Sequence, residues 1–526
     1  MQITSYGAVR EVTGSMHLLT TTNDRILLDC GMFQGKRKES DEKNRNMEID
    51  PKIITNVVLS HAHVDHCGRI PILTKNGFPG RIISTRVTAD ACDYLLRDCG
   101  HIQESDAVYL NYKTVRSFLY KLEQSSKKKP LPESKLNAIK KRLKTATHRI
   151  DTQAVDSVIK ENRLHAVEPI YTAEDAEHSL GFFEGYPYRE PITVGKDVTC
   201  TFFDAGHIIG SASVLLEIKE NGKVFRILYS GDIGRSNRPI INDPDINFPK
   251  EDRKIDLLIM ESTYGDRIHG PIEGVKDKLK HILEETNSRG GSIIIPAFAF
   301  GRTQELIYML HEIYDEGGIK RLPIYIDSPL AGNLTRVFGE HPEVYDDETH
   351  KTFLEKGKNP FMFDKIHFIQ SVEESMDLLN KKEPNIVISA SGMCEAGRIL
   401  HHLRYKIHNP NNTILLVGYM AEHTLGRRIK EEGLKFEQDG RKGDAPIMKF
   451  MDKTYPLNAR VRELEGFSGH ADKNELLSYL KNSKLDIAKI ALVHGEEDQM
   501  IPFGSFLEQN GYKVCIPRKG ESITLK

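Results

Sequence analysis

The sequence predicts an α/β protein, and three observations support that fold class. Short apolar runs rich in β-branched residues, such as Ile53–Ser60 (IITNVVLS), have the length of strands and end in polar residues. Between Glu261 and His470 such runs alternate with helical patterns, which is typical of a parallel sheet. The chain has 526 residues, of which 39% are hydrophobic, enough for more than one core. We therefore expect two intertwined domains, one inserted in the other.

The strand Ile53–Ser60 leads directly into the hexapeptide His-Ala-His-Val-Asp-His at residues 61–66. Three imidazoles and a carboxylate within six positions form two chelating sets. His61 and His63 can face one metal ion while Asp65 and His66 turn toward a second. A histidine-rich surface turn is the alternative, but it does not explain why the group directly follows a buried strand.

Three further polar residues stand at the ends of predicted strands. His207 follows a strand in Phe202–Gly210 (FFDAGHIIG), and Asp232 ends another in Leu228–Gly234 (LYSGDIG). A histidine and a bridging aspartate would complete two metal shells. Asp29 ends the strand ILLD, where it either orients a ligand histidine through a hydrogen bond or is an ordinary turn residue.

The order of these motifs resembles the metallo-β-lactamase superfamily: HxHxDH, a later histidine, then a Ser-Gly-Asp strand end. The resemblance implies an αββα sandwich with two Zn²⁺ ions at one edge of the paired sheets. Carried over to this chain, it gives the first zinc to His61, His63 and His207, the second to Asp65 and His66, and a bridging role to Asp232.

The second half of the chain is similar to the β-CASP nuclease branch of that superfamily. Glu261 follows a strand, His470 lies in GFSGH, and His494 follows the strand Ile487–Val493. The resemblance implies a zinc-dependent ribonuclease, acting as an endonuclease or also from the 5′ end, with RNA as partner. His494 would complete the second zinc site, and His470, held by Glu261, would protonate the leaving oxygen. Asp65 is the third expected catalytic group.

Two alternative activities stay open at this point. In DNA-processing members of the branch an apolar residue replaces the third-motif histidine, so His494 favours RNA over DNA. A small-molecule lactam or thioester hydrolase is the other alternative, since one fold serves several chemistries. The resemblance divides the chain into a metallo-β-lactamase domain at 1–265 and 468–526 and a β-CASP domain at 266–467.

Strand-to-helix turns in the expected β-CASP domain have the form of a phosphate cradle. Its predicted strands are Ser292–Pro296, Pro323–Ile326 and Asn385–Ala390, the last leading toward a helix expected at Glu395–Tyr405. The candidate phosphate-binding residues are Ser389, Ser391 and Gly392, with Arg302 and Arg398 adding positive charge near helix starts. An ordinary β–α turn would use the same small residues.

Basic residues concentrate in one segment although the formal net charge of the chain is only −2. Residues 111–150 hold twelve Lys or Arg against two Glu. We expect a basic helical insertion at about 112–162, with helices at Tyr112–Gln124 and Glu133–Thr147. It is either a solvated hairpin or an arm that binds RNA, because clustered lysines neutralise phosphates.

The seven cysteines show no CxxC pairing, which favours free thiols in a reducing compartment. No signal-peptide pattern and no apolar stretch of membrane-spanning length occurs. We expect a cytoplasmic protein without a membrane span. A homodimer stays open.

Overall fold

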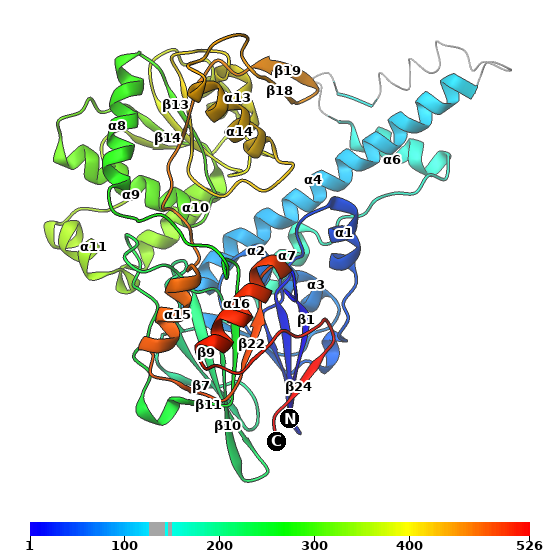
Figure 1. The fold of residues 1–526 in the computed structure, drawn as a ribbon. Coiled ribbons are helices and arrows are strands. Elements are labelled where there is room, and N and C mark those ends of the chain that lie inside the picture. The colour runs from blue at the N-terminus through cyan, green and yellow to red at the C-terminus, as the bar shows by residue number, and fades with distance from the viewer. Residues whose placement is uncertain (126–142, 146–149) are drawn as a thin grey trace.

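The computed structural model describes residues 1–125, 143–145 and 150–526. Figure 1 shows two bodies stacked on one another, with a long helix running diagonally along them and projecting beyond. Both ends of the chain lie together at the far end of the lower body (Figure 1). The C-terminal segment therefore returns to the domain in which the chain begins.

The lower body is a sandwich of two seven-stranded sheets. The first sheet has the order β24 (Ser522–Thr524), β1 (Gln2–Gly7), β2 (Met16–Thr20), β3 (Arg25–Leu28), β4 (Asn56–Val58), β5 (Ile82–Thr85), β6 (Phe183–Tyr186). The second has the order β23 (Val514–Cys515), β22 (Ile490–Val493), β12 (Leu257–Glu261), β10 (Lys223–Tyr229), β9 (Ala212–Glu220), β8 (Val198–Asp204), β7 (Pro191–Thr193). A two-stranded ribbon joins β11 (Lys254–Ile255) and β21 (Asp486–Ile487).

Apolar side chains from both sheets fill the space between them. Ile26 and Val58 from the first sheet share one cluster with Phe202, Ile259 and Val493 from the second. The outer faces are covered by helices, α3 (Ile70–Lys75), α4 (Arg86–Ser125) and α7 (Ala173–Leu180) on one side, α15 (Lys473–Asn482) and α16 (Glu497–Gln509) on the other. The expected αββα sandwich is thereby confirmed.

Parallel pairing explains why the expected site residues meet. β3 and β4 run parallel, with Leu28 opposite Val58, so Asp29 and the loop after β4 leave the sheet at one edge. In the second sheet β10, β12 and β22 are also parallel. Glu261 lies opposite Val493 in that register, directly before His494. The carboxyl ends of these strands place the ligand loops side by side.

The upper body is built on a six-stranded sheet whose strand pairs are all parallel. Its order is β15 (Ile366–Phe368), β14 (Ile324–Ile326), β16 (Ile386–Ser389), β13 (Ile293–Pro296), β17 (Thr413–Leu416), β20 (Arg460–Glu463). Its helices are α8 (Val275–Ser288), α9 (Arg302–Glu316), α10 (Pro329–Glu340), α11 (Asp347–Thr352), α12 (Val372–Leu379), α13 (Ile399–Lys406) and α14 (Leu425–Gln438), with a β18 (Ile447–Phe450) and β19 (Lys453–Pro456) hairpin. The predicted parallel sheet is confirmed.

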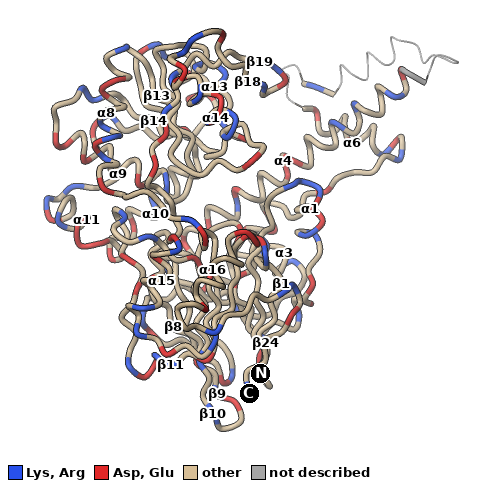
Figure 2. Tube along the Cα trace, viewed as in Figure 1, with Lys and Arg blue, Asp and Glu red and all other residues tan. Residues whose placement is uncertain are grey.

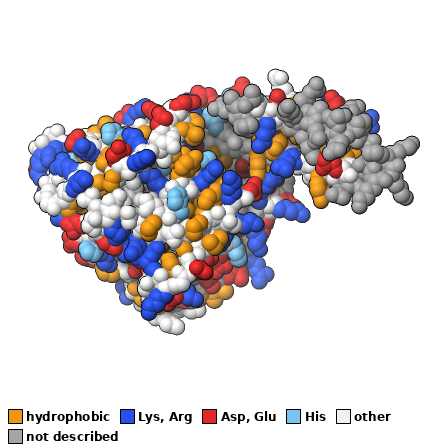
Figure 3. Space-filling view, turned by 90° about the horizontal axis from the view of Figure 1, so that it is seen from above, with side chains coloured by type: hydrophobic (Ala, Val, Ile, Leu, Met, Phe, Trp, Pro, Cys, Tyr) orange, Lys and Arg blue, Asp and Glu red, His pale blue; other side chains and the backbone are white. Residues whose placement is uncertain are grey.

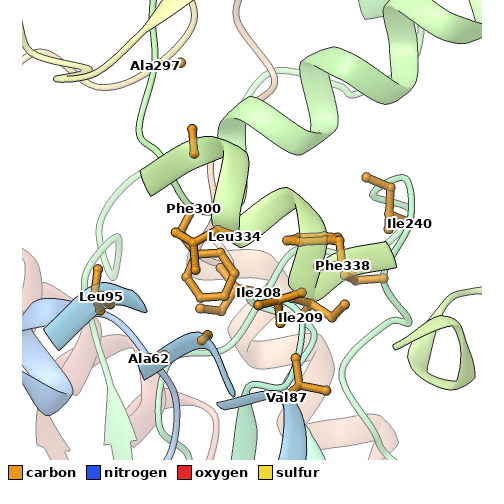
Figure 4. Packing of buried hydrophobic residues seen from close by; sticks show 14 of the residues in the cluster. Ala62, Val87, Leu95, Ile208, Ile209, Ile240, Ala297, Phe300, Leu334 and Phe338 are labelled. Atoms are coloured by element: carbon orange, nitrogen blue, oxygen red, sulfur yellow. The ribbon is translucent and has the colours of Figure 1, made fainter. Parts of the chain in front are cut away.

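The two bodies share one continuous hydrophobic core. Figure 4 shows Phe300, Leu334 and Phe338 from the upper body against Ile208 and Ile209 from the lower one. All five side chains are at most 6% exposed. The contact is apolar and buried, so it holds the upper body over the sheet edge where the ligand loops end.

Two predicted helices were placed wrongly. The helix after β16 begins at Ile399, not at Glu395, because residues 391–398 form a loop. The helix expected from Tyr112 is the outer part of α4, which already begins at Arg86. It continues through Gly100, where a Cβ would lie 2.7 Å from the Ala173 backbone. Glycine is needed there because α7 packs so closely.

The second basic helix, expected at Glu133–Thr147, lies largely outside the described residues. Its described part, residues 143–145, is non-helical, and Lys144 forms an isolated bridge with Ile150. A helix that the sequence did not reveal, α6 (Thr152–Glu161), packs along α4 through Val155 and Ile159. Two short helices, α1 (Arg37–Arg45) and α2 (Val64–Cys67), complete the lower body. Among the described helices, none is long and apolar enough to cross a membrane.

Candidate metal centre

The loop after β4 and the short helix α2 bring the four ligand-type residues of the hexapeptide into two adjacent groups. Nε2 of His61 lies 3.0 Å from Nδ1 of His63, which in turn lies 3.1 Å from Nε2 of His207. Two nitrogens on a tetrahedral zinc would be about 3.3 Å apart, given Zn–N bonds of about 2.0–2.1 Å. The ring nitrogens of this trio thus converge at ligand spacing.

A second group forms beside the first. Nε2 of His494 lies 3.0 Å from Nε2 of His66 and 3.6 Å from Oδ2 of Asp65. His494, on the loop after β22, therefore joins Asp65 and His66, as the resemblance implied. One ligand atom from each of these three residues fits within 4.8 Å of the others.

Asp232 lies between the two groups. Its Oδ2 is 3.4 Å from Nε2 of His61, 3.3 Å from Nε2 of His66 and 3.6 Å from Nε2 of His207. Its Oδ1 is 3.6 Å from Nε2 of His494 and, although buried, accepts no hydrogen bond among the described residues. A buried carboxylate oxygen without a donor fits a cation, because such an oxygen is costly to leave unpaired.

Electrostatics keep the histidines of the first group in the form that binds a metal. Burial lowers the pKa of His61 and His207 well below the usual range and that of His63 to about 4, so these rings stay neutral. Neutral imidazoles and carboxylates are the forms that bind zinc. Burial also opposes the charge of His66, but Asp232 and Asp29 outweigh burial and raise the pKa of His66 well above its usual range, so zinc binding there would displace a proton. By ligand type, the five histidines and two aspartates fit two ions of this kind.

The Asp29 carboxylate holds the ligand loop through hydrogen bonds. Its Oδ2 accepts hydrogen bonds from Nδ1 of His66 at 2.6 Å, Oη of Tyr229 at 2.6 Å and Oγ of Ser60 at 2.8 Å. Oδ1 accepts from the Ser60 backbone N–H at 2.7 Å. A hydrogen bond to the second ring nitrogen fixes the tautomer that leaves Nε2 of His66 free to bind a metal.

Glu261 and His470 form a pair beside the centre. Nδ1 of His470 lies 3.1 Å and 3.2 Å from the two carboxylate oxygens of Glu261. Glu261 also accepts the Ile233 backbone N–H at 2.6 Å, which fixes its position. Burial opposes the imidazolium, but Glu261 and Asp232 outweigh it and raise the pKa of His470 to about 9.

Glu261 lies close enough to act as a ligand itself. A carboxylate oxygen of Glu261 fits within 4.8 Å of ligand atoms on Asp232 and His494. Its two oxygens already hold His470, so the structure places Glu261 between the metal cluster and the candidate proton donor.

The predicted phosphate-binding residues all make contacts within the upper body. Oγ of Ser389 is buried and donates to the Asp327 carbonyl at 2.9 Å, and Arg398 binds the Asp327 carboxylate at 2.8 Å. The same carboxylate accepts from His402 at 2.6 Å. Ser389 and Arg398 thus both bind Asp327, Ser389 at the backbone carbonyl and Arg398 at the buried carboxylate.

The remaining candidates have other partners. Oγ of Ser391 accepts the backbone N–H groups of Glu395 and Ala396 at 3.1 Å and 3.5 Å, so it caps its own loop. A Cβ on Gly392 would lie 3.1 Å from the Phe298 ring. Arg302 pairs with Glu305 and stands over the Phe467 ring at 4.7 Å.

Several residues that support the centre carried no signal in the sequence. Oγ1 of Thr263 lies 3.1 Å from Nδ1 of His494, and the Gly469 carbonyl lies 3.0 Å from Nδ1 of His207. Arg238 donates to the carbonyls of His207 and Gly469 at 2.6 Å and 3.2 Å. Only Tyr229, a hydroxyl-bearing residue that ends its strand directly before Ser230-Gly231-Asp232, could have been noticed.

Comparisons with known proteins agree with this geometry. Family models match residues 9–93 (metallo-beta-lactamase superfamily), 303–429 (Beta-Casp domain) and 454–517 (Zn-dependent metallo-hydrolase RNA specificity domain). The chain is 32% identical to a ribonuclease of Thermus thermophilus over 99% of this chain and 100% of that protein.

Archaeal proteins named transcription termination factor FttA are also similar. Identity is 28% for Methanocaldococcus jannaschii, over 100% of this chain and 72% of that protein. It is 27% for Methanosarcina mazei, over 96% and 68%. The chain therefore belongs to the β-CASP branch of the metallo-β-lactamase superfamily, together with the Thermus ribonuclease.

Proposed function

We propose that the protein is a zinc-dependent ribonuclease that hydrolyses phosphodiester bonds of RNA. One observation carries the proposal: two clusters of histidine and aspartate side chains meet at Asp232, and the Glu261–His470 pair lies beside them. The similarity to a named ribonuclease over the full length supports RNA as the substrate. The match to an RNA specificity domain supports it too, since residues 454–517 include His470 and His494.

We assign one zinc to His61, His63 and His207 and a second to Asp65, His66 and His494, with Asp232 between them. Bound zinc would supply Lewis acidity that activates water and neutralises charge on the scissile phosphate. Hydrogen bonds fix one proposed ligand of each zinc: the Asp29 carboxylate binds Nδ1 of His66, and the Gly469 carbonyl binds Nδ1 of His207.

His470 supplies the proton in this proposal. Its imidazolium is stabilised by Glu261, which also sets the ring orientation through Nδ1. Nε2 would then donate to the departing 3′-oxygen and leave a 5′-phosphate on the product. The ring stands beside His207, with 4.5 Å between centroids, so the proton donor lies at the edge of the metal cluster.

The domain division follows the strands. We place the metallo-β-lactamase domain at 1–265 and 468–526 and the β-CASP domain at 266–467, because β22, β23 and β24 complete the two sheets of the sandwich. All seven cysteines are free, which supports a reducing compartment such as the cytoplasm.

Purified protein tests the activity directly. One RNA labelled internally and at its 5′ end should be cut only when zinc is present. Products of intermediate length identify an endonuclease, and mononucleotides released from the 5′ end identify an exonuclease. Intact RNA with zinc-loaded protein would contradict the proposal.

The metal assignment has its own test. Elemental analysis should find about two zinc ions per chain, and Asp232→Asn or His494→Ala should lose metal and cleavage together. Asp327→Asn is the matched control, since this buried carboxylate binds His402 and Arg398 instead. If His494→Ala keeps both ions and full cleavage, its assignment is wrong.

A further inference from the structure

Helix α4 carries an exposed stripe of tyrosine and basic side chains on its projecting part. Tyr109, Lys113, Arg116 and Tyr120 follow one another at spacings of three or four residues, so they share one helix face about 60° wide. All four are exposed, and Tyr109 and Tyr120 are 42% and 61% exposed. Figure 3 shows hydrophobic and basic side chains next to one another where the arm leaves the body.

The stripe has a rigid support. Val115 and Leu119 on another face of α4 are buried against Val155 and Ile159 of α6. This small core holds the outer helix in place without using the stripe. Exposed tyrosines on a fixed surface are typical of binding sites, because they offer large apolar area at low entropic cost.

Basic side chains lie against the tyrosine rings of the outer helix in cation–π contacts. Nζ of Lys113 lies 4.7 Å from the centroid of the Tyr109 ring, and Cζ of Arg116 lies 5.8 Å from that of Tyr112. Nζ of Lys144 lies 6.0 Å from the same Tyr112 ring. Tyr112, Arg116, Tyr120 and Lys144 line a surface pocket of ≈ 380 Å³, in which Glu123 is the acidic residue.

The charges around the stripe favour an anionic ligand. Two acids flank the stripe: Asp106, three residues before Tyr109, is paired with Arg37 at 2.9 Å, and Glu123, three residues after Tyr120, lines the pocket. The four cations Lys113, Arg116, Lys121 and Lys144 outnumber them. Figure 2 shows that basic residues continue along the outer part of α4. Aromatic rings interleaved with cations are the arrangement that binds single-stranded nucleic acid, the rings stacking on bases and the cations contacting phosphates.

We propose that this stripe binds a stretch of single-stranded RNA remote from the scissile bond. The inference rests on the proposed ribonuclease function and extends it. α4 begins at Arg86, whose neighbours Thr85 and Thr88 bind the Gly210 carbonyl near His207. Tyr109 is 23 residues further on, about 35 Å along the helix.

This separation makes binding depend on the length of the RNA. A substrate shorter than about ten stacked nucleotides reaches the metal centre but not the stripe, at about 3.4 Å per nucleotide. The stripe would therefore retain long RNA while leaving the cleavage of short oligonucleotides unchanged.

The experiment measures affinity and cleavage separately on the full-length, zinc-loaded protein. Binding of a cleavage-resistant phosphorothioate RNA of about 40 nucleotides is titrated at several salt concentrations. Tyr109→Ala with Tyr120→Ala should weaken this binding about 5- to 100-fold for each stacked base lost. Lys113→Gln with Arg116→Gln should lower the slope of log affinity against log salt by about 0.7 for each phosphate contact removed.

Two control variants match the substitutions. Lys121→Gln removes an exposed charge on α4 about 100° away from Tyr120, and Tyr405→Ala removes a 43% exposed tyrosine on α13. Both should bind long RNA like the wild type. Circular dichroism and zinc content check that all variants fold.

The outcomes separate this inference from the proposed function. Weaker binding of long RNA in the stripe variants, with unchanged cleavage of a six-nucleotide substrate, supports it. Wild-type affinity and salt slope in these variants overturn it, as does an equal loss in the control variants. If the wild type binds RNA through the stripe but cleaves none, the proposed function fails and the binding site stands.

Discussion

At the scale of single residues, the centre is held by backbone conformations that side chains usually avoid. Asp29 and His494 have φ of 59° and 52°. Such conformations cost on the order of 1–3 kcal/mol for residues with a Cβ. The backbone N–H of Asp29 donates to Val58 at 3.1 Å and that of His494 to Ala8 at 2.7 Å. The surrounding strands therefore impose these conformations and aim both side chains at the metal cluster.

Replacing His470 should affect cleavage but not zinc binding, unlike replacing the proposed metal ligands around it. We expect His470→Ala to keep its zinc and bind RNA but to cleave about 10²- to 10⁴-fold more slowly, the usual contribution of a general acid. Single-turnover cleavage and elemental analysis measure both effects. A substrate whose leaving group needs no proton should recover much of the rate.

An exposed histidine serves as the control for this variant. His401→Ala, on the solvent side of α13, should cleave like the wild type. Loss of zinc from His470→Ala, or the absence of rescue, would instead make His470 a ligand or a packing residue.

At the scale of elements, the sequence predicted what strand ends determine and missed what loops determine. His61, His207, Asp232 and His494 each follow an apolar strand, and parallel pairing brings such ends together. Arg238 lies in an irregular loop and binds Glu305, 67 residues further on. No local pattern links two such positions, because the contact exists only after the bodies pack.

The loop after β16 shows the same limit. Its small residues predicted a phosphate cradle on a helix start. The helix begins later than predicted and Ser389 is 1% exposed, while phosphate binding by Ser391 and Gly392 stays a prediction. Whether a loop donates hydrogen bonds to a ligand or to itself depends on tertiary packing.

Ser391 tests whether this loop contacts substrate. If the loop binds a phosphate next to the cut, Ser391→Ala should raise KM for RNA with little change in kcat or zinc content. Ser389→Ala is the control for structure, because its hydroxyl is buried and should affect stability by about 1 kcal/mol. An unchanged KM would leave the loop as an ordinary strand-to-helix turn.

At the scale of the whole molecule, a buried ion network joins the two bodies at the metal centre. Glu305 of α9 binds Arg238 at 2.5 Å and also Arg302. Both Glu305 and Arg238 side chains are 5% exposed. Arg238 in turn holds the carbonyls of His207 and Gly469, so the upper body positions residues next to the ligands.

Removing the shared carboxylate should therefore affect stability and catalysis together. Glu305→Gln leaves two buried arginines without their counter-charge, and we expect a loss of about 3–5 kcal/mol in the free energy of unfolding. Cleavage should slow as Arg238 loses its position. Glu316→Gln, on the exposed end of the same helix, should cost less than about 1 kcal/mol. Equal losses in the two variants would exclude a special role for the network.

A second contact between the bodies depends on pH. His341, at the end of α10, binds Asp90 of α4 and Glu343, each at 2.8 Å. Burial opposes its charge, but the two carboxylates outweigh burial and raise the pKa of His341 above its usual value of about 6.5. The positive charge of Arg86 also lies near Glu343, where it opposes the positive charge of a protonated His341.

The sign of the pH effect follows from this raised pKa. Because the folded protein binds the proton more tightly than the unfolded chain, the bridge stabilises the fold fully below about pH 6.5. That stabilisation is lost as the pH rises through the raised pKa of His341. Asp90 and Glu343 are 55% and 58% exposed, so solvent screens the bridge and limits it to about 1 kcal/mol.

We therefore expect His341→Asn to be less stable than the wild type at pH 6 and nearly equal to it at pH 8.5. Urea unfolding at both pH values measures the difference in free energy, and hydrogen exchange in α10 locates it at the contact between the bodies. His408→Asn, at an exposed position without this bridge, should show no such dependence. A difference between His341→Asn and the wild type that stays constant or grows from pH 6 to pH 8.5 would exclude titration of His341 as a control on domain docking.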